Sequence, residues 1–593
     1  MILQSLCEYY QRKADSGNIA PLGLQYKEIP FIIVIDSDGN FLRIEDTREG
    51  EGKAKRAKSF LVPAEIERTS GVKANLLWGT AEYTLGISET GNKKTKEKQQ
   101  AFLNKLEETF ISAPALDIVK PLIHFLKSNP AQSIAEALNN GGDESSLEVW
   151  NDEISKGKVN LTFKLDGESQ TFAENETLRN SCIHPEKSES SGSMRCLITG
   201  EKCTPEATHT RIKNVLGAQT FGAAIISFNR NAFKSYGKDQ NHNAPVSFEA
   251  VFQYTTALNQ LLEKDSKNKV TIGDSTTVFW AERRNPLEDD FPAFFGYTAK
   301  DNPDAEIKAV KNLYQGVYTG RETEYSSTRF YVLGLSPNAS RISVRFWLQG
   351  TVSEFARNIK QHFDDLEIIR SPRDQGRYSL FWILSAISQE NKTSNIPPVI
   401  AGNIVESILT GGCYPQTMLQ QTLRRIRATH DISRIRAAVL KAYLNRFNRT
   451  YQKPEKEITM SLDTENKNIG YLLGRLFSAL EKIQEDANPG LNATIKDRFY
   501  GAASATPVTV FPQLLKLAQH HLSKIENVGY RINRERLLGE IFQGISDIPA
   551  HLSMEDQARF AIGYYHQQQN FFTKKVKNES EKTNEQEIQE QLI

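Results

Sequence analysis

Glycines and side-chain amides set apart the stretch from Arg211 to Ser247, where the sequence carries its clearest binding chemistry. Gly217, Gly222 and Gly237 interrupt any regular periodicity, and glycine lets a backbone approach a ligand closely. An amide can offer both a donor and an acceptor to one base edge. The amides of the stretch are Gln219, Asn229, Asn231, Gln240, Asn241 and Asn243. The pattern predicts either a loop that reads or clamps a ligand, or an irregular loop held by its own side-chain to backbone hydrogen bonds.

A second candidate loop is basic and polar and lies between residues 53 and 75. It ends at the apolar run Leu76-Leu77-Trp78, which has the composition of a core segment. A loop anchored in this way could present Lys73 and Asn75 to the groove of a nucleic-acid duplex. The alternative is a solvated loop with an ordinary charged surface.

The strongest local excess of charge lies between residues 424 and 449, where a run of basic side chains stands against a single acid, Asp431. The basic residues are Arg424, Arg425, Arg427, Arg434, Arg436, Lys441, Arg446 and Arg449. Three of them recur every seven residues and would share one face of a continuous helix, although a break at 429–431 could offset that face. We expect this track to contact phosphates, against the alternative of a solvated helix face. Cations that could extend the track are Arg341, Arg345, Arg357, Lys360, Arg370, Arg373 and Arg377.

The sequence gives weaker support for a metal site or a catalytic site. The candidate zinc ligands are Cys182, His184, Cys196, Cys203 and His209. The C-x6-C spacing does not match the pairs typical of structural zinc, so separate buried thiols are the simpler interpretation. Phosphate-loop, nucleophile-elbow and zinc-protease motifs are missing from the sequence, and we interpret the acidic pairs Asp364-Asp365 and Glu481 with Glu485 as solvated carboxylates. We therefore expect no catalytic residues, no metal and no cofactor, and predict that the protein is not an enzyme.

Apolar periodicity indicates which elements position these segments. In the first part of the chain we predict a helix at 1–14, a hairpin at 29–35 and 41–44, helices within 93–140, a strand at 158–165, a helix at 248–262, a strand at 276–280 and a second hairpin at 330–335 and 342–348. Beyond it we predict helices at 353–366, 378–387, 398–409, 416–428, 432–447, 469–484, 511–525, 534–544 and 554–572. The fold class is therefore α+β, with a mixed N-terminal region carrying β-hairpins and an all-α C-terminal bundle.

Length and composition bound this organisation. A chain of 593 residues exceeds one hydrophobic core, and its net charge of +1 argues against a uniformly basic nucleic-acid glove. Five cysteines argue against a disulfide-built protein, and the N-terminal residues do not resemble a signal peptide, so we expect a soluble cytoplasmic protein without membrane contact. We predict an α+β recognition region at 1–350, a basic helical connector at 351–455, a helical bundle at 456–573 and a disordered tail at 574–593.

Several segments together resemble the large subunit of the subtype I-C CRISPR Cascade surveillance complex. The central matches are Gly217-Ala218-Gln219, Ser227-Phe228-Asn229, Ala232 to Gly237 and Asn243 to Val246. Further matches are Arg68 to Gly71 with Asn75 to Trp78, Tyr471 to Phe477, Tyr500 to Ser504 and Phe560 to His566. The resemblance runs in order along essentially the whole chain, and its specificity comes from the combination of segments.

The resemblance implies a non-catalytic subunit that recognises a short protospacer-adjacent motif on double-stranded DNA, helps to open the duplex and supports the displaced strand while CRISPR RNA pairs with the target. The implied partners are the Cascade backbone subunits, the subunit at the 5′ end of the guide, small subunits and a recruited nuclease-helicase. Residues expected near the DNA motif or the opening bases are Arg68, Thr69, Lys73, Asn75, Lys213, Gln219, Asn229, Lys238 and Asn243. Residues expected along the nucleic-acid backbone are Arg424, Arg425, Arg427, Arg434, Arg436 and Lys441.

The C-terminal helices resemble a small subunit that such systems can make by starting translation inside the same gene. Met460 is the methionine placed just before these helices, so an internal start there would give a polypeptide of residues 460–593. Two other functions stay open at this point. One is a nucleic-acid enzyme, such as a nuclease with a dispersed metal site, and the other is a scaffold that binds RNA or proteins without reading DNA.

Overall fold

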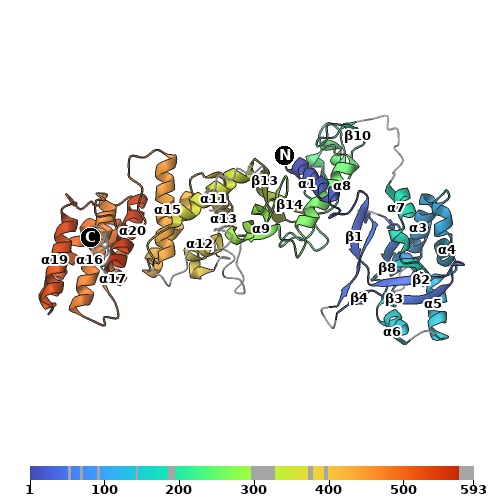
Figure 1. Cartoon of the computed structure of the whole chain (residues 1–593), viewed down its shortest axis with the longest axis horizontal. Coiled ribbons are helices and arrows are strands. Elements are labelled where there is room, and N and C mark those ends of the chain that lie inside the picture. Colours follow the sequence, from blue (N-terminus) through green and yellow to red (C-terminus); the bar gives the residue numbers. More distant parts are fainter. Residues whose placement is uncertain are drawn as a thin grey trace, which may run out of the picture. The chain divides into compact units, whose positions relative to one another are not determined.

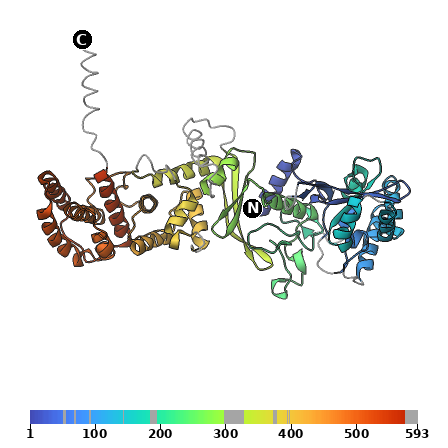
Figure 2. The same cartoon turned by 90° about the horizontal axis from the view of Figure 1, so that it is seen from below.

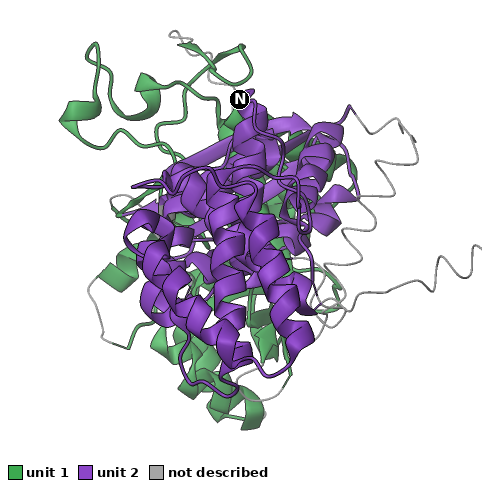
Figure 3. Ribbon diagram, turned by 90° about the vertical axis from the view of Figure 1, so that its left-hand side faces the viewer, with its two compact units in different colours: residues 1–214, 218–263, 339–342 green, residues 215–217, 264–338, 343–593 purple. Residues whose placement is uncertain are grey.

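The computed structural model describes residues 1–50, 55–66, 71–89, 94–141, 144–183, 194–295, 327–370, 378–392, 395 and 398–572 (Figure 1). The chain forms two compact units (Figure 3). Unit 1 comprises residues 1–214, 218–263 and 339–342, and unit 2 comprises residues 215–217, 264–338 and 343–593. No helix among the described residues combines the length and the apolar character needed to cross a membrane.

A four-stranded sheet lies at the centre of unit 1, in the order β3-β2-β8-β7. Strand β2 (Phe31–Ile35) is buried at every position, as expected for an apolar run covered on both faces. It pairs in parallel with β8 (Asn160–Leu165) and antiparallel with β3 (Phe41–Asp46), while β7 (Trp78–Thr80) pairs antiparallel with β8. The predicted first hairpin and the predicted strand at 158–165 are confirmed.

Helices cover this sheet through the periodic apolar residues of the 93–140 segment. They are α3 (Lys94–Thr109), α4 (Ala115–Lys127) and α5 (Pro130–Asn139). The ring of Phe163 on β8 lies 6.3 Å from Phe102 of α3 and 6.1 Å from Phe125 of α4, centroid to centroid. The helices predicted within 93–140 are confirmed. Their buried faces supply most of the apolar core that packs on the sheet.

The opening helix α1 (Ile2–Asp15) packs beside α8 (Phe248–Leu261), as predicted for both segments (Figure 1). The rings of Tyr10 and Phe252 meet edge to face at 5.9 Å. The other strands and helices of unit 1 are β1 (Leu24–Glu28), β4 (Arg48–Glu49), β5 (Arg56–Ala57), β6 (Ser59–Pro63), α2 (Ala81–Thr84), α6 (Glu144–Asp152), α7 (Glu176–Ile183), β9 (Met194–Arg195) and β10 (Lys202–Cys203).

A second four-stranded sheet belongs to unit 2 except for residues 341–342, which are part of unit 1. Its strands follow chain order: β11 (Lys269–Ile272), β12 (Ser275–Ala281), β13 (Arg329–Asn338) and β14 (Arg341–Thr351). Phe279 and Phe330 on this sheet stack against Phe291 of α9 (Leu287–Phe295), with ring centroids 4.4 and 5.5 Å away. The strand at 276–280 and the second hairpin are confirmed, whereas β11 went unpredicted.

The sheet passes directly into helix α11 (Val352–Leu366) through a capping box. Thr351 Oγ1 accepts a hydrogen bond from the Glu354 N–H at 3.2 Å, and the Glu354 carboxylate accepts one from the Thr351 N–H at 2.8 Å. These two bonds satisfy donors that the start of a helix leaves unpaired. They fix the change from strand to helix at the position where the helical periodicity begins.

Among the described residues from Val352 onward, the regular elements are helices and 3₁₀ turns. The α-helices after α11 are α12 (Leu380–Ile387), α13 (Pro398–Thr410), α14 (Gln416–Thr429), α15 (Arg434–Thr450), α16 (Ile469–Ala487), α17 (Ile495–Ala505), α18 (Phe511–Lys524), α19 (Val528–Phe542) and α20 (Met554–Phe572). Figure 2 shows the last of these, in orange to red, gathered into one bundle. The α+β class and every predicted C-terminal helix are confirmed, while α17 went unpredicted.

Glycines bring α16 and α20 into close contact within this bundle. A β-carbon at Gly474 would overlap the carbonyl oxygen of Phe560, and one at Gly563 would overlap the carbonyl oxygen of Tyr471. The two helix backbones can approach this closely only because side chains are missing at the crossing. Phe477 and Phe560 pack beside it, with ring centroids 5.8 Å apart.

The compact units divide the chain differently from the predicted regions. One buried apolar cluster runs from Val270 on β11 to Tyr565 on α20, so it crosses the predicted boundaries at residues 350 and 455. The predicted boundaries mark changes in secondary structure and in charge, because sequence patterns report those properties. The buried apolar core continues across both boundaries. The predicted disordered tail at 574–593 lies outside the described residues.

Candidate nucleic-acid interface

The first candidate surface consists of the exposed arginines of α14. Leu419, Leu423 and Ile426 are buried at helical spacing, and this amphipathic pattern turns Arg424 and Arg427 toward solvent. A guanidinium presented by a packed helix can bind a phosphate through two parallel hydrogen bonds. This part of the predicted phosphate track is therefore accessible.

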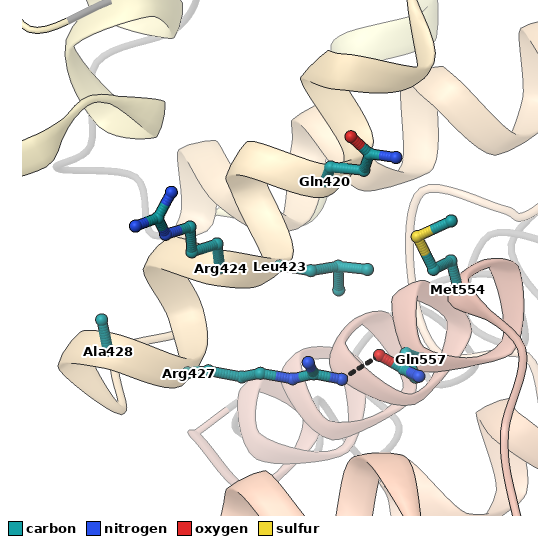
Figure 4. Close-up of a pocket in the computed structure, with 7 residues that line it drawn as sticks. All are labelled: Gln420, Leu423, Arg424, Arg427, Ala428, Met554 and Gln557. Carbon is teal, nitrogen blue, oxygen red and sulfur yellow. Dashed lines mark hydrogen bonds between the residues drawn. The ribbon is translucent and has the colours of Figure 1, made fainter.

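Two surface pockets lie beside these arginines. The first, of about 370 Å³, is lined by Gln420, Leu423, Arg424, Arg427, Ala428, Met554 and Gln557 (Figure 4). Arg427 donates a hydrogen bond across it to Gln557 Oε1 on α20, whereas the guanidinium of Arg424 points away from that pair (Figure 4). The second pocket, of about 300 Å³, is lined in part by Arg424 and Arg425. Arg424 thus borders both hollows.

The break predicted at residues 429–431 is present. His430 ends α14 in the left-handed region, with φ 51°, and α15 begins at Arg434. The Arg434 guanidinium lies over the ring of Tyr378, 5.0 Å from its centroid, and is half-buried. The arginines of α14 and Arg434 therefore belong to two helices rather than to one continuous face.

Besides Arg446, which is 2 % exposed, two further members of the predicted track face the protein interior. Arg436 is 4 % exposed and donates hydrogen bonds to Thr429, to Asp431 and to the carbonyl oxygen of Ala386. Lys441 is 5 % exposed, and its Nζ donates to the carbonyl oxygen of Asp365 at 2.9 Å. Burial lowers the pKa of both groups. Because neither cation reaches solvent, we leave both out of the proposed interface.

The interior that holds Lys441 also contains carboxylates predicted to be solvated, and for Asp365 and Glu481 that prediction is wrong. Asp365 accepts a hydrogen bond from Arg446 Nε at 3.0 Å, and each side chain of this pair is 2 % exposed. Glu481 accepts from the hydroxyls of Thr494 and Tyr564. The neighbouring members of the two acidic pairs, Asp364 and Glu485, are half-buried and form ion pairs with lysines of their own helices.

The second candidate surface is the glycine-rich stretch, which the structure confirms to be mostly irregular. Ile212 and Ala223 exchange two backbone hydrogen bonds of 2.9 Å each and close a loop between them. Gly222 has a φ of 93°, and a β-carbon there would lie 2.9 Å from the carbonyl oxygen of Ile212. Gln219 is exposed in this loop, and Lys213 is exposed beside its base.

Two amides farther along the stretch, Asn229 and Asn243, form hydrogen bonds within the protein. Asn229 Oδ1 accepts from Arg341 Nη2 at 2.7 Å. Asn243 Oδ1 accepts from the Ser235 N–H at 2.8 Å, and its Nδ2 donates to the carbonyl oxygens of Lys238 and Gln240. The alternative of an irregular loop held by its own hydrogen bonds therefore describes Asn243, whereas the Lys238 side chain is exposed.

In the basic-polar loop, Asn75 has a structural role and Lys73 is accessible. Asn75 is 2 % exposed, and its Oδ1 accepts from the Ile66 N–H at 3.1 Å, so this amide oxygen is already bonded inside the protein. Lys73 is exposed. Arg68 and Thr69 lie outside the described residues.

Unit 1 brings the two candidate loops together. Lys213 Nζ lies 3.8 Å from Oε2 of Glu65, a residue of the basic-polar loop. Burial raises the pKa of Glu206, and the positive charge of Lys73 opposes that shift. The Glu206 N–H in turn donates to the carbonyl oxygen of Val246, at the end of the glycine-rich stretch. The Lys213–Glu65 contact therefore joins the glycine-rich stretch to the loop that contains Lys73.

Three of the residues considered for zinc, Cys196, Cys203 and His209, can be placed in the structure. His209 Nδ1 lies 2.6 Å from the hydroxyl of Tyr254, and burial lowers the pKa of His209 to about 4. Cys196 and Cys203 are free thiols beside the short β9–β10 ladder. The part of the chain that the structure describes contains no group of three or more side chains suited to a metal ion, and His184 lies outside that part.

The sequence predictions did not include the exposed aromatic residues of the glycine-rich stretch from Arg211 to Ser247. Phe221, Phe233 and Tyr236 are exposed, and Arg341, predicted as an extension of the phosphate track, lies over the Phe233 ring at 4.2 Å from its centroid. The signal was present as basic and aromatic residues that alternate from Arg230 to Lys238.

Comparison with known proteins gives one finding. Residues 6–572 match the model of a family described as CRISPR-associated protein (Cas_Csd1). No curated protein matches the chain.

Proposed function

Because this chain belongs to the Cas_Csd1 family of CRISPR-associated proteins, we propose that it is the non-catalytic large subunit of a subtype I-C surveillance complex. In this role it binds double-stranded DNA at a protospacer-adjacent motif, aids duplex opening and supports the displaced strand, while CRISPR RNA reads the target by base pairing. Its partners are the backbone subunits, the subunit at the 5′ end of the guide, small subunits and the nuclease-helicase that cuts DNA.

The observation that carries the proposal is that accessible cations and an accessible amide lie on two loops of unit 1 that touch each other. Lys213 stands beside the base of the loop that presents Gln219, and it contacts Glu65 of the basic-polar loop, which contains Lys73. Lysines add affinity by neutralising phosphates, and both a lysine and an amide can distinguish bases through hydrogen bonds to base edges in the major groove. This arrangement supports motif recognition, and Asn75 has no part in the reading because its oxygen is used inside the protein.

The test is motif preference in the assembled complex. We expect Gln219→Ala and Lys73→Ala each to reduce the ratio of affinities for duplexes with and without the preferred motif, by about ten-fold where the lost contact is bidentate. The control is Lys158→Ala, an exposed lysine of the same unit whose side chain is 82 % accessible. Unchanged preference in both test variants, measured by equilibrium binding to targets that differ only in the motif, contradicts the assignment of these readers.

The α14 arginines are expected to act on affinity rather than on preference. Arg424→Ala should weaken binding uniformly across motifs and reduce the slope of log affinity against log salt by about 1, because one phosphate contact is lost. Arg536→Ala removes an exposed arginine from α19 and serves as the control. A loss confined to one motif, or an unchanged salt slope in titrations of the assembled complex, argues against phosphate contact.

We include in the proposal a second product that starts at Met460 and contains α16 to α20. In the full chain, the Met460 carbonyl accepts from the Ile369 N–H at 2.8 Å, and the Tyr565 hydroxyl donates to the Ile369 carbonyl at 2.9 Å. A separate product has to replace these contacts with others in the complex. Mass spectrometry of the untagged complex detects it as a distinct C-terminal polypeptide, and its absence there counts against the internal start.

A further inference from the structure

Three aromatic side chains of the glycine-rich stretch face solvent. Phe221 is 57 % exposed, Phe233 is 38 % exposed and Tyr236 is 98 % exposed. An aromatic side chain left this open forgoes the stabilisation that burial would give, so three of them within one stretch indicate a surface that binds a ligand. The rings belong to unit 1, as does Arg341 beside them.

The loop holds Tyr236 outward through specific bonds. Tyr236 and Gly237 both occupy the left-handed region, with φ 53° and φ 69°, a conformation that is strained for a tyrosine. Asn243 binds this turn on both sides, accepting from the Ser235 N–H and donating to the Lys238 carbonyl. The exposure of the ring therefore follows from a turn that the protein stabilises at some cost.

Cations already lie against two of the three rings. The Arg341 guanidinium lies 4.2 Å from the centroid of Phe233 and donates to Asn229, and the Arg211 guanidinium lies 4.8 Å from the centroid of Phe221. Stretch 211–247 carries five basic residues and one acid, Asp239, which pairs with Lys234. The surface thus combines flat apolar rings with an excess of positive charge.

This combination fits a nucleic acid whose bases are unpaired. Such bases stack on aromatic rings and on guanidinium planes, while their phosphates are drawn to surrounding cations. Bases inside a duplex are stacked on one another and offer no open face. The positive excess disfavours a purely apolar partner, and it favours a polyanion.

We propose that Tyr236, together with Phe233 and Phe221 of the same stretch, forms a stacking surface for the unpaired bases of single-stranded nucleic acid. The proposal deepens the proposed function, on which it rests, by assigning the loop to the separated strand rather than to the motif-bearing duplex. Tyr236 supplies the accessible ring, and Arg341 and Arg211 orient the neighbouring rings.

The experiment compares two oligonucleotides of equal length, an oligo-dT strand and its abasic counterpart, which carries the same phosphates without bases. Binding to the full chain is measured at equilibrium at one fixed salt concentration. The wild-type protein is expected to prefer oligo-dT. Tyr236→Ala should lower oligo-dT affinity by about ten-fold and leave abasic affinity unchanged, whereas Tyr236→Phe should retain the wild-type preference, because stacking needs the ring and not the hydroxyl.

The matched control is Tyr26→Ala, which removes another exposed tyrosine of unit 1 and should bind both strands as the wild type does. Equal wild-type affinity for the two strands, or Tyr236→Ala binding oligo-dT normally, overturns the proposal. So does a Tyr236→Ala defect seen only in assembly with other subunits, which indicates a protein partner. Motif preference of the assembled complex is scored separately, so failure of the stacking site and failure of the proposed function give different results.

Discussion

Replacing Asp365 with alanine is expected to lower the free energy of unfolding of unit 2 by about 3–5 kcal/mol. The Asp365 carboxylate is the buried counter-charge of Arg446, and it also pairs with Arg449. The truncation leaves the Arg446 guanidinium in the interior with neutral acceptors such as the Ser407 carbonyl oxygen. An unpaired buried charge is far more costly than an absent pair, and this makes the single substitution severe.

The adjacent Asp364 provides the control for this prediction. Its carboxylate pairs with Lys360 near the surface, so Asp364→Ala should change stability by less than about 1 kcal/mol. The paired substitution Asp365→Leu with Arg446→Met should recover much of the loss, because it removes both charges. Chemical denaturation of the full chain, followed through unit 2, measures all three, and equal midpoints for the two single variants would refute the account.

A methyl group at the α16–α20 crossing is the second change with a large expected effect. Gly474→Ala places a β-carbon against the Phe560 carbonyl oxygen and 2.9 Å from the Tyr564 nitrogen. Backbone atoms cannot rotate away as a flexible side chain can, so the helices must separate and loosen their packing. We expect a loss of about 3 kcal/mol, the upper end for overpacked cores, after the gain of less than 1 kcal/mol from helix propensity is included.

Gly501 of α17 is the matched control, because a β-carbon there meets no atom within 4 Å. Gly501→Ala should therefore stabilise the chain by about 0.5–1 kcal/mol through helix propensity alone. Thermal unfolding of the two variants should shift in opposite directions. Shifts of the same sign would show that the crossing tolerates a larger residue and that glycine has no special role there.

Local patterns predicted the elements well where one face carries large apolar residues. Helix α11 illustrates this, since Phe355, Ile359 and Phe363 recur every four residues and Thr351 with Glu354 caps its start. Helix α17 lacks such a stripe, because small residues such as Ala503 and Ser504 supply much of its buried face. Strand β11 is only four residues long and owes its place to pairing with β12. Tertiary contacts decide both, and no short window contains them.

The candidate interface shows the same limit. Residue type alone predicted four binding residues with equal weight. Lys73 and Gln219 are accessible, whereas Asn75 and Lys441 are buried. Asn75 and Lys441 were indistinguishable from the accessible residues because their burial depends on distant partners. Arg341 was predicted to extend the phosphate track, but in the structure its guanidinium lies over the ring of Phe233, which precedes it by about a hundred positions in the sequence. Contacts of that range require the fold.

The pairing of α16 with α20 has a consequence for synthesis on the ribosome. Helix α16 emerges first, and α17, α18 and α19 must follow before its glycine-lined partner is available. Until then the apolar face of α16 lacks the surface that buries it, so the seam closes late in translation and chaperones have a defined interval in which to protect it. In a product that begins at Met460, the same helices still separate the synthesis of α16 from that of α20. Such a product contains both helices, so they can pack together without the preceding chain.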